Sequence, residues 1–314
     1  MEQKSFTLIE ILVVIVIIGI ISAFIIVSMA GVSDKARIAK GQAFSNSLRN
    51  SLLLDLVSEW TFDTGTTSSG ELATSEDLKD VWGSANGSPY GSAITIRDGS
   101  NCVKGKCIDL DPIDSSTLSR IDSITMSNKN NLSFTISSWV YFRDGKRWNG
   151  GVFSENAAGP IFYINSSLGV ILYYNNHPTY AGLSVFFSDS TSQSCNLYFP
   201  NDITNKWTNE VLVVKNREDV KLYINGVPST SSCSISSQDL RQSNVWLSNI
   251  GNYTTYWLNG RIDDIKIFNE AFSQTKIESV YFSSLNDLLI NNKINFFDYN
   301  QRIVGLREFL VEKN

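Results

Sequence analysis

Histidine, the side chain that most often moves protons in enzymes, occurs once in this chain, at His177. A Ser-His-Asp or Cys-His relay would therefore have to be built around that residue. His177 lies in the segment Asn175–Tyr180, where we expect an ordinary surface loop residue. The sequence also lacks a glycine-rich loop of the kind that cradles phosphate groups. These residues do not predict an enzyme.

The cysteines are the next candidates for chemistry: Cys102, Cys107, Cys195 and Cys233. A Cys-x4-Cys pair followed by two distant, isolated cysteines does not match the spacing of a zinc site. If the domain that carries them lies outside the cytoplasm, disulfides are the simplest interpretation. We expect Cys102–Cys107 to close a small loop and Cys195–Cys233 to join two strands. The alternative is that the cysteines are free thiols.

Charge and hydropathy are unevenly distributed along the 314 residues. The formal net charge is -5, and no basic stripe interleaved with aromatic residues is present, so we expect no nucleic-acid partner. Nearly all of the strongly apolar sequence precedes Val32, whereas the chain after Trp60 is rich in Ser, Thr, Asn and Gly. The later composition suits strands and turns that face water.

Residues Phe6 to Val32 form an apolar run with a single charge, Glu10. Since about 20 apolar residues suffice to cross a bilayer, the run predicts a transmembrane segment. A cleavable secretory signal, cut near Ser28-Met29-Ala30, is the alternative, but the run is longer than the apolar core of such signals. A carboxylate inside hydrocarbon costs about 2.5–3.5 kcal/mol, so Glu10 needs a specific role.

The segment Lys4-Ser5-Phe6-Thr7-Leu8-Ile9-Glu10 resembles the type IV prepilin motif. The resemblance implies that prepilin peptidase removes a leader of residues 1–5, cuts between Ser5 and Phe6, and methylates the new amine of Phe6. The family usually has Gly where this chain has Ser5. Cleavage puts a charged amine one helical turn from Glu10, or within reach of Glu10 of a neighbouring subunit, and this pairing compensates the buried carboxylate. An ordinary single-pass anchor with a stray Glu10 is the alternative.

The helix is expected to continue beyond the membrane. Residues Ser33 to Val57 contain no proline, and small or apolar side chains recur near helical spacing. A helix over residues 6–57 would be about 78 Å long at 1.5 Å per residue. Its first half would lie in the bilayer or the filament core and its second half against the head, as in pilins.

After Trp60, short runs with strand character alternate with turn signals. The runs are Phe134–Phe142, Gly169–Tyr174, Leu183–Phe187, Glu210–Val214, Val220–Ile224, Val245–Ile250 and Arg261–Phe268. The hairpin at Asn216–Asp219 and the turn at Asn225-Gly226 are the clearest local marks. Many strands at short intervals predict an antiparallel β-sandwich or jelly roll.

This region resembles the laminin-G-like and concanavalin A-like jelly rolls in several segments. These are Glu59-Trp60-Thr61-Phe62-Asp63, Phe134-Thr135-Ile136-Ser137-Ser138-Trp139-Val140, Lys206-Trp207 with Val220–Gly226, and Gly260–Phe268 followed by a short helix around Ser273–Tyr281. The resemblance implies binding of a glycan or a surface protein, often with Ca²⁺. The E-x-D-x-x-E pattern of the laminarinase-type hydrolases of this superfamily is absent.

The same resemblance suggests Asp63, Asp263 and Asp264 as calcium ligands; the alternative is that Asp63 and Asp263 cap turns and accept backbone hydrogen bonds. Aromatic side chains expected in loops or at strand ends could stack on sugars: Trp148, Tyr173, Tyr174, Tyr180, Tyr253, Tyr256 and Trp257. Trp139, Trp207 and Trp246 are expected in the core instead.

The tail after Ser284 has a helical face, an interruption at Asn291-Asn292-Lys293, and a capping pattern at Asn295 and Asp298. It predicts a small helical hairpin; a tail that recruits a peptide is the alternative. The predicted fold class is α+β: leader 1–5, a long pilin-type helix 6–57, a β-sandwich 58–283 and short helices 284–314.

The sequence favours a membrane protein that becomes an extracellular filament subunit, assembled with other pilin subunits. Three functions remain open at this stage. The head could be a solvated spacer on a structural subunit, the head of an adhesin-type minor pilin, or part of a secretion-system pseudopilin. The bulk of the head favours a minor or specialised subunit.

Overall fold

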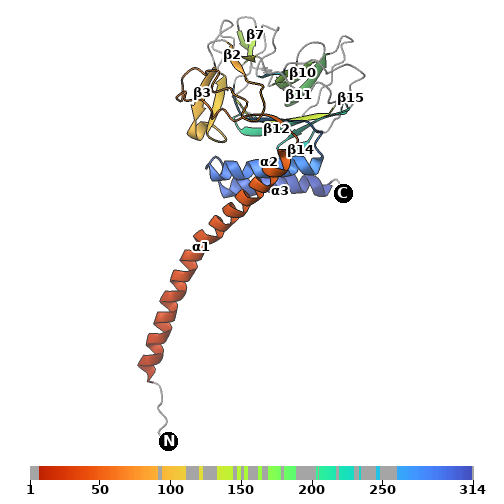
Figure 1. Ribbon diagram of the computed structural model, residues 1–314. Coiled ribbons are helices and arrows are strands. Elements are labelled where there is room, and N and C mark those ends of the chain that lie inside the picture. The colour runs from red at the N-terminus through yellow and green to blue at the C-terminus, as the bar shows by residue number, and fades with distance from the viewer. Residues whose placement is uncertain are drawn as a thin grey trace.

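The computed structural model describes most of the N-terminal and C-terminal thirds of the chain and the strands between them. The described residues are 7–90, 94–110, 120–122, 133–143, 147–149, 152–154, 162–164, 169–177, 180–188, 203, 205–216, 219–229, 233–234, 245–247 and 260–312. They form a long helix that carries a β-rich head, with a layer of helices between the two (Figure 1).

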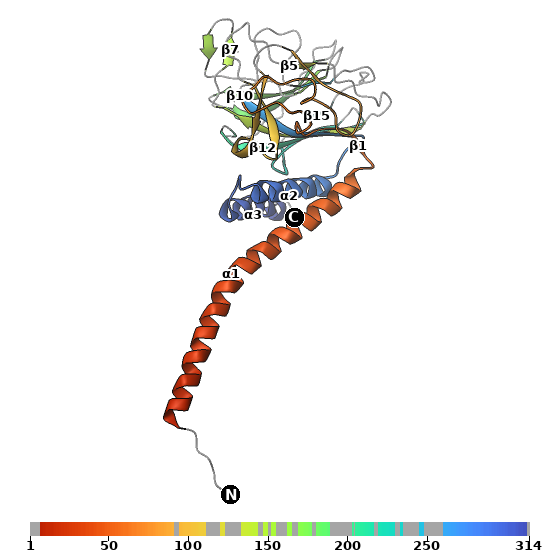
Figure 2. The same ribbon diagram turned by 60° about the vertical axis from the view of Figure 1, so that its left-hand side comes forward.

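Helix α1 (Leu8–Leu52) is 45 residues long, and its N-terminal part extends away from the head (Figure 2). Thr7 caps its start, and Leu53 is its C-cap. The predicted helix over 6–57 is therefore too long at its C-terminal end, because Leu56 already begins strand β1. Within the part of the chain that the structure describes, no helix combines the length and the apolar character that a membrane crossing requires.

The main sheet is antiparallel and has nine strands among the described residues. Its central order is β14-β13-β12-β6-β17-β4-β3, with β1 paired to β17 and β15 paired to β13. The strands are β1 (Leu56–Trp60), β3 (Ile94–Asp98), β4 (Lys106–Leu110), β6 (Phe134–Phe142), β12 (Trp207–Lys215), β13 (Asp219–Ile224), β14 (Val227–Pro228), β15 (Cys233–Ser234) and β17 (Gly260–Phe268).

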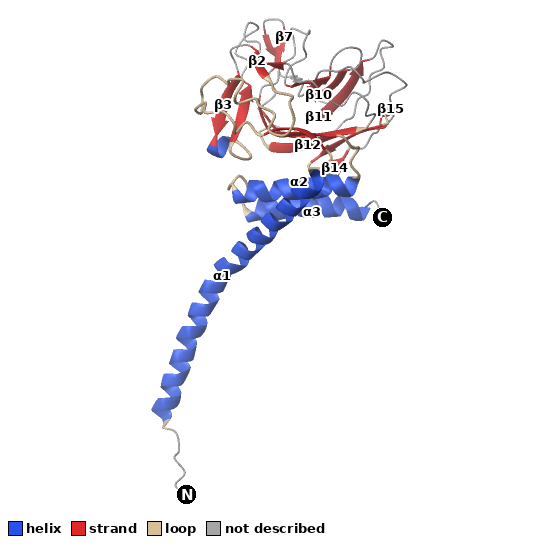
Figure 3. Cartoon of the chain, viewed as in Figure 1, coloured by secondary structure: helices blue, strands red, loops and turns tan. Residues whose placement is uncertain are grey.

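The other strands lie on the side of the main sheet opposite the helices (Figure 3). A smaller sheet has the order β2-β5-β16-β9, and β10–β11 and β7–β8 form two hairpins. These elements are β2 (Ser88–Tyr90), β5 (Arg120–Asp122), β7 (Arg147–Asn149), β8 (Val152–Ser154), β9 (Phe162–Ile164), β10 (Gly169–His177), β11 (Tyr180–Ser188) and β16 (Val245–Leu247), with the short 3-10 helix η1 (Gly99–Asn101) before β4. The predicted α+β class with an antiparallel jelly-roll head is confirmed.

The turn chemistry of the sequence fixes the hairpins of the main sheet. Asn225 and Gly226 join Ile224 to its partner Val227, and both have positive φ, 52° and 78°. This is the conformation that a tight two-residue hairpin requires and that Asn-Gly adopts at low cost. Asn216, with φ of 51°, opens the predicted hairpin between β12 and β13 in the same way.

Both faces of the main sheet are buried, each against a different layer. Val220, Leu222 and Ile224 of β13 alternate along the strand and pack into the sandwich core, as the pattern predicted. Tyr223 points the other way and packs with Val211 against the helical side. The sheet is therefore the middle layer of three.

Helices α2 (Gln274–Ile290) and α3 (Phe296–Glu312) form that third layer together with the end of α1. Ser273 caps α2 by accepting from Lys276 N at 3.3 Å, and Asn295 Oδ1 accepts from Asp298 N at 2.9 Å, which confirms the predicted cap of the second helix. The predicted domain boundary between 283 and 284 is wrong, because it falls inside α2. Ile277, Tyr281, Leu285 and Leu288 continue one buried helical face across it.

Candidate functional site

Glu10 and Thr7 cap the start of α1 through reciprocal hydrogen bonds. Its Oε2 accepts from Thr7 N at 2.8 Å and from Thr7 Oγ1 at 2.8 Å, while Thr7 Oγ1 accepts from Glu10 N at 3.4 Å. This reciprocal capping box satisfies helix N–H groups that otherwise lack partners. Ser5 and Phe6 lie outside the described residues. The carboxylate is thus aimed at the helix start, immediately after the predicted cleavage point.

The first turns of α1 expose apolar side chains all round the helix. Leu8 is 85% exposed, Ile9 68% and Phe24 79%, and the described side chains between them are exposed as well. Exposed apolar surface of this extent marks a membrane or protein contact. Within the described part of a single chain, nothing covers this face.

The second half of α1 is fixed to the head by close contacts. A Cβ placed on Gly41 would lie 2.6 Å from Asn286 Oδ1, so any larger residue would have to displace the Asn286 side chain where α1 approaches α2. One turn later, Ser45 Oγ donates to Ser283 O at 3.2 Å. Arg49 then pairs with the buried Glu59 of β1 at 3.0 Å. These contacts hold the head against the second half of α1.

A groove lies where α1 meets the helical hairpin, with a volume of about 710 Å³. It is lined by Lys40, Gly41, Phe44, Phe282, Asn286, Leu289, Phe296, Tyr299, Asn300 and Ile303. Tyr299 donates its hydroxyl to Asn286 Oδ1 at 3.0 Å, which links α3 to α2 beside the groove.

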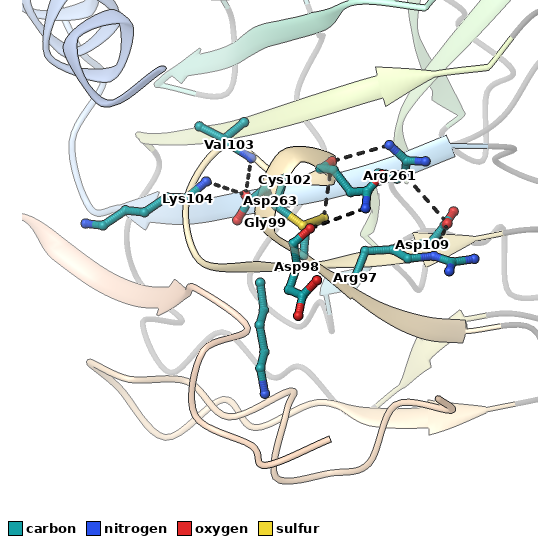
Figure 4. Close-up of a disulfide and its surroundings, with 12 residues drawn as sticks. Arg97, Asp98, Gly99, Cys102, Val103, Lys104, Asp109, Arg261 and Asp263 are labelled. Carbon is teal, nitrogen blue, oxygen red and sulfur yellow. Dashed lines mark hydrogen bonds and ion pairs between the residues drawn. A yellow bond between two sulfur atoms is a disulfide. The ribbon is translucent and has the colours of Figure 1, made fainter. Parts of the chain in front are cut away.

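The disulfide Cys102–Cys107, favoured by the sequence, is present, with Cα atoms 5.4 Å apart. The loop that it closes turns its N–H groups toward a buried carboxylate (Figure 4): Asp263 Oδ2 accepts from Val103 N at 2.8 Å and from Lys104 N at 3.1 Å. Burial and the neighbouring Asp264 charge raise the pKa of Asp263 well above its usual range, against these hydrogen bonds. The disulfide loop therefore supplies the backbone N–H donors that bind the Asp263 carboxylate. Cys195 lies outside the described residues, so its predicted bond to Cys233 stays a prediction.

A β-bulge between Asp263 and Lys266 lies at the point where β17 changes partners. Before the bulge β17 pairs with β4, and after it with β1, while β6 runs along the other edge. Asp264 has a φ of 48°, a left-handed conformation that aspartate tolerates better than most residues. The insertion keeps Ile262 and Ile265 on the same core face although they are three residues apart. The two aspartates thus have a structural role in the sheet.

The three carboxylates that the resemblance suggested for calcium have protein partners. Asp264 forms an ion pair with Lys266, Asp263 binds the disulfide loop, and Asp63 Oδ1 accepts from Lys106 N at 2.7 Å. No group of three or more His, Cys, Asp or Glu side chains within the described ranges is arranged to hold a metal ion. Asp63 and Asp263 thus accept backbone hydrogen bonds, as the alternative expected, and calcium binding by the three aspartates stays a prediction.

The aromatic candidates for sugar stacking cannot be placed, because the side chains of all of them lie outside the described residues, as does that of His177. Of the tryptophans assigned to the core, Trp139 is fully buried and stacks on Tyr281 at 6.2 Å between ring centres, on the helical side of the sheet. Trp207 is half-buried and packs edge-on against Tyr141. The side chain of Trp246 lies outside the described residues.

Two charged sites were not found from the sequence. Asp109 is fully buried and is surrounded by three arginines, with Arg97 Nε at 2.8 Å, Arg261 Nε at 3.5 Å and Arg143 in close contact. Figure 4 shows the first two of these beside the disulfide loop. The three partners come from three different strands or strand ends, so no local spacing pointed to them. A charged residue inside the run Ile108-Asp109-Leu110 was the only available signal.

The second unforeseen site is Glu210 on β12, which is 1% exposed. It shares a face with Leu212, so it points into the sandwich core, and its cross-strand neighbour Ser138 does the same. Neither carboxylate oxygen of Glu210 has a hydrogen-bond partner in the described part of the chain. Burial raises the pKa of Glu210 well above its usual range.

Comparison with known families agrees with this architecture. Residues 117–278, just over half of the chain, match the concanavalin A-like lectin/glucanases superfamily, and residues 1–26 match the prokaryotic N-terminal methylation motif. The chain therefore belongs to the concanavalin A-like lectin/glucanases superfamily. It also carries the N-terminal signal of type IV pilins, so both predicted resemblances are confirmed.

Solved structures resemble the head at low sequence identity. Domain 4 of AbnA, an extracellular GH43 arabinanase from Geobacillus stearothermophilus in complex with arabinotriose, has a TM-score of 0.50 at 17% identity and covers 72% of this chain and 98% of its own. The binding domain of botulinum neurotoxin serotype D has a TM-score of 0.53 at 17% identity over 76% of this chain and 53% of its own. The binding domain of Paraclostridial Mosquitocidal Protein 1 has 0.50 at 19% identity over 75% and 53%.

The match thus spans about half of each toxin domain, and at these identities the likeness shows the fold alone. No curated protein matches the sequence of the chain.

Proposed function

We propose that the chain is a minor or specialised subunit of a type IV pilin-like filament, which displays a lectin-like head for adhesion to a surface glycan or protein. One observation carries the proposal. The prepilin motif leads directly into a helix whose first turns are apolar and exposed all round, and the same helix is fixed to a concanavalin A-like head.

The exposed start of α1 is the assembly element in this proposal. Before assembly the apolar run Phe6–Val32 holds the chain in the cell membrane, with the head outside the cytoplasm. After prepilin peptidase cuts before Phe6, the same side chains pack against those of other pilin subunits. Glu10, already turned toward the helix start, then pairs with the amine of Phe6 of its own or a neighbouring subunit.

The head is proposed as a binding module and not as an enzyme. The fold is shared with a domain solved in complex with arabinotriose and with toxin binding domains, which supports a recognition role without identifying the ligand. The buried carboxylates offer no pair open to a substrate, since Glu210, Asp263 and Asp109 are each at most 1% exposed. A glycosidase needs two carboxyl groups that flank the scissile bond.

Two alternatives share the N-terminal motif. A secretion-system pseudopilin would carry the same signal, and a purely structural pilus subunit would use the head only as a spacer. The size of the head favours a specialised position over the main repeating subunit.

Mass spectrometry of the mature chain and purification of filaments test the proposal together. We expect a methylated Phe6 at the N-terminus and the chain as a minor band in filaments. Whole filaments should bind a glycan array or host surface, and filaments without the chain should not. An intact Met1, or a start at Gly31 after signal cleavage, would refute the pilin assignment. A main filament band with no surface binding would favour the spacer.

Glu10→Val tests the role of the carboxylate. Removal of the charge makes insertion of α1 easier by up to about 2.5–3.5 kcal/mol on insertion scales, yet it removes the partner of the Phe6 amine. We expect normal or increased membrane insertion and a loss of the chain from filaments, measured by fractionation and immunoblotting. The matched control is Glu71→Val, an exposed head residue that should leave both unchanged. Normal incorporation of the Glu10 variant would contradict the assembly role.

A further inference from the structure

A lysine ammonium occupies the turn that follows β1. Lys106, the first residue of β4, donates from Nζ to the backbone oxygen of Gly65 at 2.8 Å and to that of Thr67 at 2.9 Å. Its own N–H donates to Asp63 Oδ1 at 2.7 Å. A single residue from a distant strand therefore holds this loop at three points.

The same loop contains a buried carboxylate with one unused oxygen. Asp77 is fully buried, and its Oδ2 accepts from Thr67 Oγ1 at 2.5 Å, Thr74 N at 2.8 Å and Thr74 Oγ1 at 2.6 Å. Its Oδ1 is buried and has no hydrogen-bond partner among the described residues. Burial opposes ionisation of Asp77, but these hydrogen bonds and the charge of Lys106 outweigh it and lower the pKa of Asp77.

The unused oxygen faces the part of the loop that Lys106 binds. A Cβ placed on Gly65 would lie only 1.9 Å from Asp77 Oδ1, so the carboxylate is in direct contact with that backbone. Gly65 O and Thr67 O bind the Lys106 ammonium, and Asp77 Oδ1 lies against Gly65 in the same loop. Carbonyl and carboxylate oxygens are also the ligands that Ca²⁺ prefers.

We propose that Lys106 is a built-in cation: its ammonium takes the place of a divalent ion in the loop from Asp63 to Asp77, so the head folds without calcium. A Ca²⁺ ion beside this ammonium would be repelled by it. Removal of the ammonium should leave an oxygen-lined site that accepts Ca²⁺. This loop shares only Asp63 with the calcium ligands predicted from the sequence.

The test compares the full chain in mild detergent with Lys106→Ala, which removes the charge and vacates the space of the ammonium. For the unmodified chain we expect the same melting temperature with excess EDTA and with millimolar Ca²⁺. For Lys106→Ala we expect a melting temperature lower by roughly 5–10 °C in EDTA, because Gly65 O and Thr67 O lose their donor. Added Ca²⁺ should recover part of that loss, since an ion that binds only the folded state stabilises it.

Two controls separate this site from general effects. Lys79→Ala removes a surface lysine that pairs with Glu76, and it should neither lower the melting temperature nor create a calcium response. Adding Asp77→Asn to Lys106→Ala should abolish the recovery by Ca²⁺.

Terbium luminescence on the unmodified chain gives a result even if the variant fails to fold. The unmodified chain should show no saturable terbium site that Ca²⁺ displaces. Such a site, or stabilisation of the unmodified chain by Ca²⁺, would overturn the proposal. A folded Lys106→Ala chain that gains no calcium response would overturn it as well.

Discussion

Replacement of Glu210 by glutamine should change how the stability of the head depends on pH. The carboxyl group is 1% exposed, and neither of its oxygens has a hydrogen-bond partner among the described residues, so the charged form is disfavoured in the folded state. Burial accordingly raises the pKa of Glu210 well above 4.5. In the unfolded chain the same group titrates near its usual value. The folded state therefore holds a proton that the unfolded state releases.

The sign and size of the effect follow from proton linkage. The stability that the neutral carboxyl allows is fully present below the unfolded pKa and is lost as the pH rises toward the folded pKa. One proton corresponds to a slope of about 1.4 kcal/mol per pH unit. Between pH 5 and pH 7 the loss amounts to as much as about 2.7 kcal/mol. Glutamine has nearly the same shape and does not titrate. The stability of Glu210→Gln relative to the unmodified chain should therefore increase with pH, with this slope.

Denaturant unfolding of the full chain in mild detergent, followed by tryptophan fluorescence at several pH values, measures the difference directly. Other titrating groups, among them the buried Asp263, cancel when the two chains are compared at each pH. Glu76→Gln, at an exposed carboxylate whose side chain is 65% exposed, is the control and should run parallel to the unmodified chain. If Glu210→Gln also runs parallel to it, Glu210 is ionised in the folded head and the reasoning from burial is wrong.

Two further stability predictions follow from the contacts around β4. Cys102→Ser with Cys107→Ser should lower the free energy of unfolding by roughly 2 kcal/mol, the entropy of closing so short a loop. The double variant should also reduce amide-exchange protection at Val103 and Lys104, whose N–H groups bind Asp263. Unchanged protection would mean that the loop keeps its shape without the disulfide. Asp109→Asn should lower the free energy of unfolding by about 3–5 kcal/mol, measured with denaturant, because it leaves three arginines around a neutral group. The control Asp98→Asn, at the exposed end of β3, should change it little. Equal effects of the two substitutions would mean that the arginines are solvated.

Local patterns predicted the elements whose causes are local. The run Phe134–Phe142 coincides with β6, and Asn225-Gly226 forms the predicted turn, because strand alternation and turn conformation depend on adjacent residues. The start of α1 is just as local, since Thr7 and Glu10 cap it within one turn. The wrong boundary at 283 also has a local cause. The helix after β17 was expected to be short and to end before Leu285, although the apolar spacing continues past that residue.

The sites depend on contacts between residues far apart in sequence, and no spacing encodes those. Lys106 binds Gly65 across 41 positions, and Asp263 binds Val103 across 160. The resemblance to calcium-binding jelly rolls directed attention to the aspartates as ligands. The structure gives each of them a partner within the chain, because a lysine, a disulfide loop and an ion pair supply the donors that a metal or water would otherwise provide.

The helical layer also limits where the head can meet a ligand. In an isolated sandwich the outer face of the main sheet would be open, but here Tyr223, Val211 and Phe268 on that face pack with Phe272 and Ile277, and Trp139 packs against Tyr281. A ligand could reach this face only if α2 and the end of α1 moved away, which would expose those side chains and the buried Glu59 that pairs with Arg49. The proposed ligand must therefore bind elsewhere on the head. In the proposed filament subunit, a pulling force on the ligand would pass through the main sheet into α1 at the contacts of Gly41, Ser45 and Arg49, so these contacts would link adhesion to assembly.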